Sequence, residues 1–218
     1  MSGRSRVVLV RHAESRWNAA GIFQGHGGPG LSTEGHEQAA RLADHLLGCF
    51  DDVALIACSD LARVEETAAP TVARLEVPVE VDQRLRELDV GRWTGMPFGD
   101  VEASQPEALA AWRRFEDHDD RVESFVAFRT RVMAALRDCA AKLDGATALV
   151  FTHGGCIRIA VSAVLGLDGA AQRGLAPVHN ASVTVLDVRD GALRLVSYNE
   201  AGSEHAPRGL INYDRHAV

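Results

Sequence analysis

Residues 7–18 read VVLVRHAESRWN. The apolar run at 7–10 is typical of a strand that is buried on both faces of a parallel sheet. Arg11 and His12 follow it directly, and ligands of open α/β sheets bind at the carboxyl ends of the strands. A planar guanidinium suits phosphate oxygens, and a neutral imidazole can attack phosphorus. The stretch therefore predicts phosphoryl transfer through a phosphohistidine.

The composition favours one mildly acidic domain. A chain of 218 residues can bury one sizeable core, and no shift in composition marks a second, so we expect a single domain over residues 1–218. The 30 acidic residues outnumber the 23 basic ones, which argues against nucleic acid as a partner. Lys142 is the only lysine, so an arginine is informative here only through its position.

The cysteines and the N-terminus favour a reducing compartment. The cysteines form no C-x-x-C pair and no metal-type spacing, and we expect reduced thiols at Cys49, Cys58, Cys139 and Cys156. The first residues pass directly into a strand, and the sequence contains neither a secretory h-region nor a membrane span. We therefore expect a soluble, cytoplasmic protein that does not bind membranes.

Strand-like and helix-like segments alternate along the chain. This order predicts an α/β fold, a three-layer α/β/α sandwich with a mostly parallel central sheet. The expected strands cover 6–10, 53–58, 79–81 and 147–152, followed by a hairpin of 182–188 and 193–199. The first expected helix has Ser32 as its N-cap and covers 32–49. The other expected helices cover 61–75, 106–115, 124–143 and 154–165. Residues 21–30 form a glycine-rich loop, residues 84–95 are turn-rich, and 200–218 form a tail or a lid over a cleft.

Three of the expected strands deliver reactive side chains at their ends. Arg11 and His12 follow the first strand, Arg63 lies in the first turn of the helix after the second, and His153 follows strand 147–152. The carboxyl ends of parallel strands lie along one edge of a sheet, so two arginines and two histidines can converge there. Such a set can coordinate a phosphate without a metal ion.

A helix start and a carboxylate complete this candidate site. Gly154 and its neighbour open a helix, so their N–H groups can face an anion. Glu87, within LRELDVGRWTG at 85–95, is the candidate proton donor, because protonating the bridging oxygen of an ester accelerates its cleavage about 10²–10⁴-fold. Glu14, Asp60 and Asp89 are the alternative acids.

Ordered motifs resemble those of the histidine phosphatase superfamily, the phosphoglycerate mutase-like proteins. RHAESRWN at 11–18 is similar to the signature R-H-G-E-[ST]-x-W-N of that family. The later motifs match in order: FQG at 23–25, LSTEG at 31–35, SDLARVEET at 59–67, LRELDVGRWTG at 85–95 and THGG at 152–155. Together they cover most of the chain, and the resemblance implies a phosphoglycerate mutase-like fold.

The resemblance also implies a role for each matching residue. His12 would become phosphorylated, and Glu87 would protonate the leaving oxygen and then activate water. The transferring phosphoryl group would be bound by Arg11, Arg63 and His153. Phosphate or substrate would further be held by Asn18, Gln24, Gly25 and Gly154. The other histidines show no metal-type spacing, so we expect no metal and no cofactor.

The sequence departs from the family pattern at three places. The signature glycine is Ala13, which is strained if the backbone there needs a positive φ. The aspartate of the Q-G-x-x-D loop is Gly28, which could loosen the wall of the pocket. A frequent P-x-G-G-E-S stretch is present only as RVES at 121–124, which leaves the substrate-facing segment near 118–124 undefined.

Three functions remain open at this point. Mutases of the family continue from the acid as E-R-x-Y-G-x-L-x-G-L-N-K, whereas residues 87–98 read ELDVGRWTGMPF, which favours a phosphomonoester hydrolase. WRRF at 112–115 resembles the R-R segment of the mutases and favours a bisphosphoglycerate-dependent phosphoglycerate mutase as the alternative. The third is a non-catalytic phosphate-binding module, although His12, Arg63 and His153 are all retained. The partner would be a small-molecule phosphomonoester, and homodimer formation stays open.

Overall fold

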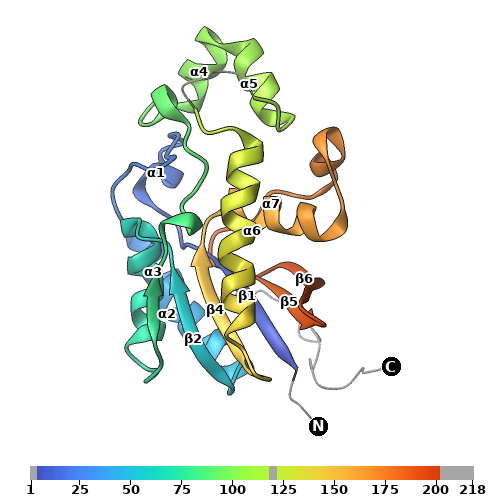
Figure 1. Ribbon diagram of the computed structural model, residues 1–218. Coiled ribbons are helices and arrows are strands. Elements are labelled where there is room, and N and C mark those ends of the chain that lie inside the picture. The colour runs from blue at the N-terminus through green and yellow to red at the C-terminus, as the bar shows by residue number, and fades with distance from the viewer. Residues whose placement is uncertain (1–3, 118–121, 202–218) are drawn as a thin grey trace.

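A six-stranded sheet forms the centre of the structure, a computed structural model that describes residues 4–117 and 122–201. The strand order is β3-β2-β4-β1-β5-β6 (Figure 1). The strands are β1 (Ser5–Arg11), β2 (Val53–Cys58), β3 (Val79–Val81), β4 (Thr147–Thr152), β5 (Ser182–Arg189) and β6 (Ala192–Ala201). β5 is antiparallel to both of its neighbours, and the other pairs are parallel. The prediction of a mostly parallel sheet is confirmed.

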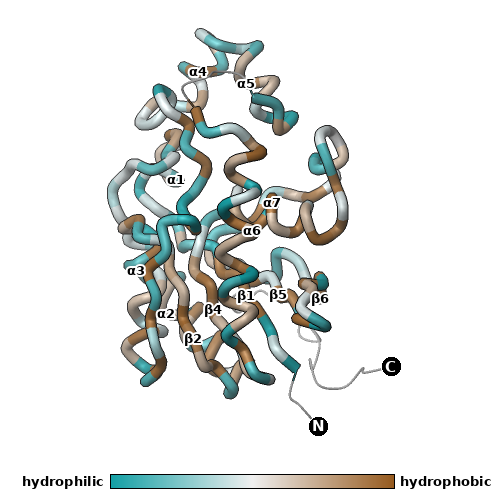
Figure 2. The backbone as a smooth tube through the Cα atoms, in the orientation of Figure 1, coloured by the Kyte–Doolittle hydropathy of each residue, from teal (hydrophilic) through white to brown (hydrophobic). Residues whose placement is uncertain are grey.

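Helices cover both faces of the sheet. They are α1 (Arg16–Ala19), α2 (Thr33–Cys49), α3 (Ala62–Val72), α4 (Phe98–Ser104), α5 (Pro106–Arg113), α6 (Phe125–Ala141) and α7 (Gly154–Leu165). Side chains alternate across a strand, so Val8 and Val10 of β1 pack with α2 and α3, while Val7 and Leu9 pack with α6 and α7. The predicted three-layer sandwich is confirmed. Apolar residues concentrate along the neighbouring strands β2 and β4 (Figure 2).

Local signals fix the ends of several elements close to their predicted positions. Ser32 caps α2, with its hydroxyl accepting a hydrogen bond from the N–H of Gly35 at 2.9 Å, as expected for an N-cap serine. Strand β4 is buried over its whole length, and the chain then passes through His153 into α7. Because β1 and β4 are parallel neighbours, Arg11 pairs with Thr152 at the same edge of the sheet.

The short helices α1 and α4 were not expected. α4 begins directly after Pro97, and its buried Val101 packs into a small apolar cluster with Phe23 and Trp93. Its seven residues are too few to be stable without such tertiary contacts. Together, α4 and α5 stand above the end of the sheet at which β2 and β4 finish (Figure 1).

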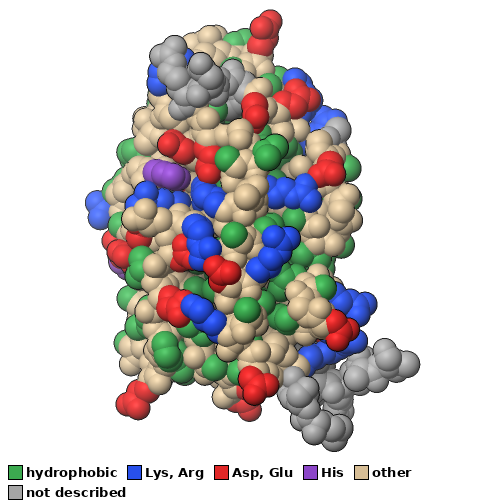
Figure 3. Space-filling model, in the orientation of Figure 1, with side chains coloured by type: hydrophobic (Ala, Val, Ile, Leu, Met, Phe, Trp, Pro, Cys, Tyr) green, Lys and Arg blue, Asp and Glu red, His purple; other side chains and the backbone are tan. Residues whose placement is uncertain are grey.

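The surface carries charges of both signs. On the face formed by α6, acidic and basic side chains are interspersed (Figure 3). Ion pairs there include Arg84 with Asp138 and Lys142 with Glu80. None of the helices in the described ranges has the length and apolar character needed to span a bilayer. β6 ends at Ala201, and the predicted tail or lid beyond it lies outside the described residues.

Candidate active site

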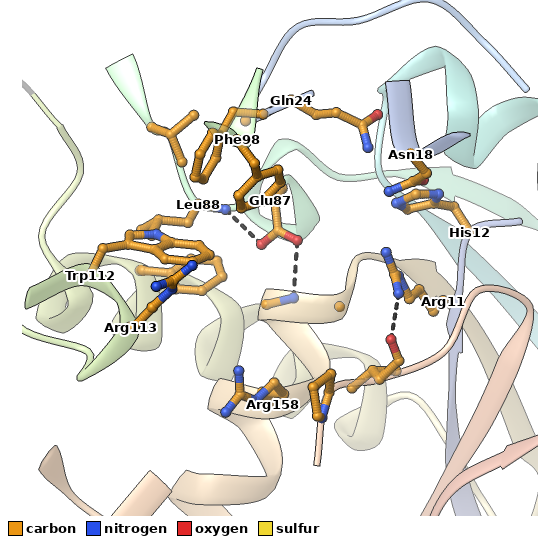
Figure 4. A pocket seen from close by; sticks show the side chains of 18 of the residues that line it. Arg11, His12, Asn18, Gln24, Glu87, Leu88, Phe98, Trp112, Arg113 and Arg158 are labelled. Carbon is orange, nitrogen blue, oxygen red and sulfur yellow. Dashed lines mark hydrogen bonds between the residues drawn. The ribbon is translucent and has the colours of Figure 1, made fainter. Parts of the chain in front are cut away.

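The carboxyl ends of β1, β2 and β4 open into a cavity of about 400 Å³ (Figure 4). The sequence-predicted residues that line it are Arg11, His12, Asn18, Gln24, Gly25, Arg63, Glu87 and Gly154. We call the region around Arg11, His12, Arg63 and Gly154 the phosphate end of the cavity. The predicted side chains therefore converge at the edge of the sheet, and His153 lies among them but does not line the cavity.

His12 is buried and has one ring nitrogen free for chemistry. Its Nδ1 lies 2.7 Å from the carbonyl oxygen of Ala13, and a carbonyl only accepts, so Nδ1 carries the proton and donates it there. The lone pair is then on Nε2. Burial, followed by the positive charges of Arg63 and Arg11, lowers the pKa of His12 well below its usual value. The imidazole is therefore neutral at physiological pH, as a nucleophile must be.

Two arginines flank His12, of which Arg63 is buried and Arg11 is half-buried. Arg11 donates through Nη1 to the carbonyl of Val178, and Arg63 donates to the carbonyl oxygens of Gly27 at 2.9 Å and Gly25 at 2.8 Å. The Nε atoms of both arginines are buried and have no hydrogen-bond partner in the part of the chain that the structure describes. Burial lowers the pKa of Arg63 to about 10, which leaves it protonated at neutral pH. Both side chains are thus fixed by the backbone, with donors left for an anion.

His153 lies behind the cavity wall and not on it. Its ring packs edge-on against His12, with the ring centroids 5.3 Å apart. Arg63 donates to Nδ1 at 3.1 Å, so the proton sits on Nε2, which donates to the hydroxyl of Ser59 at 2.9 Å. Both ring nitrogens are therefore engaged inside the protein, and the implied contact of His153 with the phosphoryl group stays a prediction.

Glu87 faces the cavity from the turn-rich segment and is held by the start of α7. Its carboxylate accepts hydrogen bonds from the N–H of Leu88 at 2.9 Å and of Gly155 at 3.0 Å (Figure 4). A Cβ on residue 155 would lie 2.1 Å from Glu87 Oε1, so only glycine lets the carboxylate approach the helix this closely. The second glycine of the THGG motif therefore positions the candidate proton donor.

Arg131 of α6 fixes the backbone that carries Glu87. It donates to the carbonyl oxygens of Arg84 at 2.8 Å, Arg86 at 2.6 Å and Glu87 at 2.8 Å. Its Nε atom is 2.6 Å from Glu123 in an ion pair whose two side chains are largely buried. Nothing local in the sequence indicated this role, because Arg131 lies far along the chain in the middle of a helix.

Asn18 and Gln24 present their amide nitrogens to the cavity. The N–H of Ser15 donates to Asn18 Oδ1 at 3.1 Å, and the Ser15 hydroxyl donates to Gln24 Oε1 at 2.7 Å. Asn180, which the sequence did not single out, donates to Asn18 Oδ1 and to the carbonyl of His12. With both amide oxygens occupied, Nδ2 and Nε2 are the groups that can donate to a substrate. Gly25, by contrast, contributes mainly the carbonyl that holds Arg63.

The departures from the family pattern have structural explanations. Among the residues that the structure describes, those other than glycine with a positive φ do not include Ala13, so alanine is unstrained there. Its methyl group is fully buried, and its N–H donates to Thr67 Oγ1. Gly28 has a φ of 110° and lies against Trp17, a conformation that an aspartate would adopt only with strain. Of the RVES stretch, residue 121 lies outside the described residues.

Aromatic side chains form the other end of the cavity. We call this region the aromatic end, and its rings are those of Phe23, Phe98, Trp112, Phe115, Phe125 and Phe128. The rings of Phe23 and Phe98 stack with centroids 3.8 Å apart, and Phe23 meets Trp112 edge-on at 5.5 Å. In Figure 4, Glu87 lies between this end and His12. The cavity therefore joins the end with the two arginines beside His12 to an end lined mainly by aromatic rings, with the carboxylate of Glu87 between them.

The matching family model covers residues 7–201 and is described as the histidine phosphatase superfamily, branch 1. The chain belongs to the histidine phosphatase superfamily. The resemblance drawn from the ordered motifs is confirmed, and so is the fold that it implied. Among the described residues, no group of three or more histidines, cysteines and carboxylates is arranged to hold a metal ion.

Relatives in this superfamily carry different activities. The chain is 32% identical over 197 residues to a probable phosphoglycerate mutase GpmB of Enterobacter sp. (strain 638), covering 85% of this chain and 86% of the relative. It is 33% identical to a metal-independent phosphoserine phosphatase of Arabidopsis thaliana, over 85% and 77% of the two chains. A mycobacterial glucosyl-3-phosphoglycerate phosphatase solved with VO3 matches with a TM-score of 0.81 and 31% identity, over 89% and 98% of the chains.

Proposed function

We propose that this chain is a metal-independent phosphomonoester hydrolase that works through a phosphohistidine on His12. The observation that carries the proposal is the state of that imidazole. It is neutral, its Nδ1–H donates a hydrogen bond to the carbonyl oxygen of Ala13, and its Nε2 carries the lone pair. Beside it, Arg11 and Arg63 have buried Nε donors that no described residue accepts from. A nucleophile next to a preorganised anion site is what phosphoryl transfer requires.

In the first step, the phosphoryl group of the ester is transferred to His12. Arg11, Arg63 and the start of α7 at Gly154 bind the phosphoryl oxygens, and the His12 Nε2 lone pair forms a bond to phosphorus. The bond between phosphorus and the ester oxygen breaks, and its electrons stay on that oxygen. Glu87, in its protonated form, donates a proton to the oxygen, so the leaving group departs as an alcohol.

In the second step, water removes the phosphoryl group. Glu87 is now a carboxylate and accepts a proton from a water molecule, whose oxygen bonds to phosphorus. The P–N bond breaks, the electron pair returns to Nε2, and inorganic phosphate leaves. The positive charges around His12 stabilise the transferring group in both steps, and neither step needs a metal ion.

A phosphoglycerate mutase is the second candidate, because a relative is named so and because Arg113 of the WRRF segment lines the cavity. A mutase would return the phosphoryl group to another hydroxyl and keep water out. The rings of the aromatic end weigh against this candidate, since glycerate has no apolar group to pack against them. A binding module without activity is disfavoured, because the nucleophile and its cations are all retained.

The test uses two assays, each with EDTA. Purified protein is incubated with p-nitrophenyl phosphate and, separately, with 3-phosphoglycerate plus 2,3-bisphosphoglycerate as primer. We expect EDTA-resistant hydrolysis of the first and no isomerisation of the second. Isomerisation without hydrolysis would support the mutase instead. Hydrolysis that EDTA abolishes would contradict metal independence, and inactivity in both assays would favour the binding module.

A further inference from the structure

The aromatic end contains a cation that the proposed hydrolysis does not use. Arg158 lies on α7, four residues after Gly154, and both residues line the cavity. Residues four apart share one face of a helix and are separated by about 6 Å along its axis. Arg158 therefore lies on the same wall as the phosphate end, one helical turn farther out. Figure 4 shows it below Arg113 and Glu87, away from His12.

The guanidinium of Arg158 is held in place but is not neutralised. Its Cζ lies 4.7 Å from the centroid of the Phe115 ring, and Nη2 is 3.3 Å from the carbonyl oxygen of Leu175. The Nε atom is buried and has no hydrogen-bond partner among the described residues, as is true of Arg11 and Arg63 at the phosphate end. Within the described ranges, no carboxylate forms an ion pair with Arg158. An arginine keeps its charge in a protein, so this position has an unmatched positive charge and an open donor.

Arg113, the other arginine at the aromatic end, differs from Arg158 in its solvent exposure and in having an ion-pair partner. Arg113 also lines the cavity, but its side chain is 54% exposed and forms an ion pair with Glu102 at 3.1 Å. Its charge is therefore already compensated and screened by solvent. Glu87 is the one carboxylate among the described lining residues, and it belongs to the chemistry at phosphorus. A second anion on the substrate is what would match Arg158.

The surroundings of Arg158 restrict what can carry that anion. The wall between it and the phosphate end consists largely of aromatic and aliphatic side chains, and the ring of Phe125 meets that of Phe115 edge-on at 5.4 Å. Burying polar groups against such a wall without hydrogen bonds is unfavourable. We infer that Arg158 binds a carboxylate on the leaving group, so that the preferred substrates are phosphomonoesters whose leaving group combines an apolar body with a carboxylate. This inference rests on the proposed function and names its substrate class.

The direct test measures binding with ligands that cannot be hydrolysed. Benzylphosphonate supplies a phosphate mimic and a ring, and 3- and 4-(phosphonomethyl)benzoate add only a carboxylate. Charge-assisted hydrogen bonds are the strong ones, so we expect the better of the two carboxylates to bind the wild-type chain about tenfold more tightly than benzylphosphonate in calorimetry. Arg158→Gln should reduce this ratio to near one, whereas Arg137→Gln, an exposed arginine of α6 outside the cavity, should preserve it.

Arg158→Met is the second variant, because it removes the charge and keeps an unbranched apolar side chain at this position. Thermal melting verifies that each variant folds. The inference is overturned if the wild-type chain binds benzylphosphonate and the carboxylate ligands equally tightly, or binds none of them. It is also overturned if the folded Arg158 variants still bind a carboxylate ligand more tightly than benzylphosphonate. EDTA-resistant hydrolysis of phenyl phosphate tests the proposed function separately. If phenyl phosphate is hydrolysed but the carboxylate ligands bind no more tightly than benzylphosphonate, the proposed function stands and carboxylate binding by Arg158 is rejected. If they bind more tightly but phenyl phosphate is not hydrolysed, the proposed function is rejected and carboxylate binding by Arg158 stands.

Discussion

The phosphate end and the aromatic end of the cavity are built in opposite ways. At the phosphate end, Arg11 and His12 come directly from a strand terminus, and hydrogen bonds to backbone carbonyls fix their polar atoms. At the aromatic end, Phe98 and Trp112 come from short helices laid over the sheet, and ring contacts hold them. The difference separates two tasks. In the proposed mechanism, the edge of the sheet determines the reaction, and the helices above it determine which leaving group fits.

The largest effect is expected from His12→Ala. Without Nε2 no phosphohistidine forms, so kcat should fall about 10⁴–10⁶-fold for every phosphomonoester, whatever its leaving group. Steady-state assays with aryl and alkyl phosphates measure the change, and His45→Ala on α2, outside the cavity, is the matched control. Near-normal turnover of any ester by His12→Ala would show that His12 is not the nucleophile.

Glu87→Gln should discriminate between leaving groups. An alkoxide needs a proton to depart and a nitrophenolate does not, so kcat/KM should fall about 10²–10⁴-fold for β-glycerophosphate and far less for p-nitrophenyl phosphate. Because kcat/KM reports the steps up to the first irreversible one, it isolates phosphorylation of His12 from the later attack of water. Equal losses for both esters would show that Glu87 does not protonate the leaving oxygen.

Arg131→Met tests whether the segment that carries Glu87 must be held in place. Loss of the hydrogen bonds to the carbonyls of residues 84, 86 and 87 should displace the acid, and small displacements of catalytic groups are costly. We expect kcat/KM for β-glycerophosphate to fall about tenfold, with a smaller loss for p-nitrophenyl phosphate. Arg137→Met on the same helix is the control. A uniform loss for both esters would mean that Arg131 only stabilises the fold.

The smallest effect belongs to the aromatic end. Trp112→Ala removes a ring that contacts Phe23, and such aromatic contacts contribute about 0.5–1.5 kcal/mol. We expect kcat/KM to fall about three- to tenfold for phenyl phosphate and to change little for methyl phosphate, which does not reach that ring. The same loss for both esters would contradict the division of tasks between the two ends.

Sequence patterns predicted the strands of the sheet and the longer helices, but not the short helices. Strands β2, β3 and β4 match their predicted ranges, and β4, which is buried over its whole length, has a continuous apolar run in the sequence. β3 is short, and two of its three residues are exposed. The helices α1 and α4 were missed, since they are short and depend on tertiary packing. The predicted helix at 61–75 is observed as α3, which begins at Ala62 and ends at Val72.

The site was predictable where it is attached to strand ends. Arg11, His12 and Arg63 follow or begin regular elements, so their convergence follows from the parallel sheet. Arg131 and Asn180 reach the site only through packing of distant segments, which no local pattern encodes. Arg158 had a signal in its spacing of one helical turn from Gly154, and that signal becomes informative only once the cavity is known.

The most direct test of the account is to trap the phosphorylated protein. Glu87→Gln should transfer the phosphoryl group from p-nitrophenyl phosphate to the imidazole but activate water poorly, so the intermediate should accumulate. Mass spectrometry of protein quenched in alkali should then find one added phosphoryl group, labile to acid, on the peptide that contains His12. No added group under these conditions, or a phosphoryl group on another residue such as Ser59, would contradict the central claim.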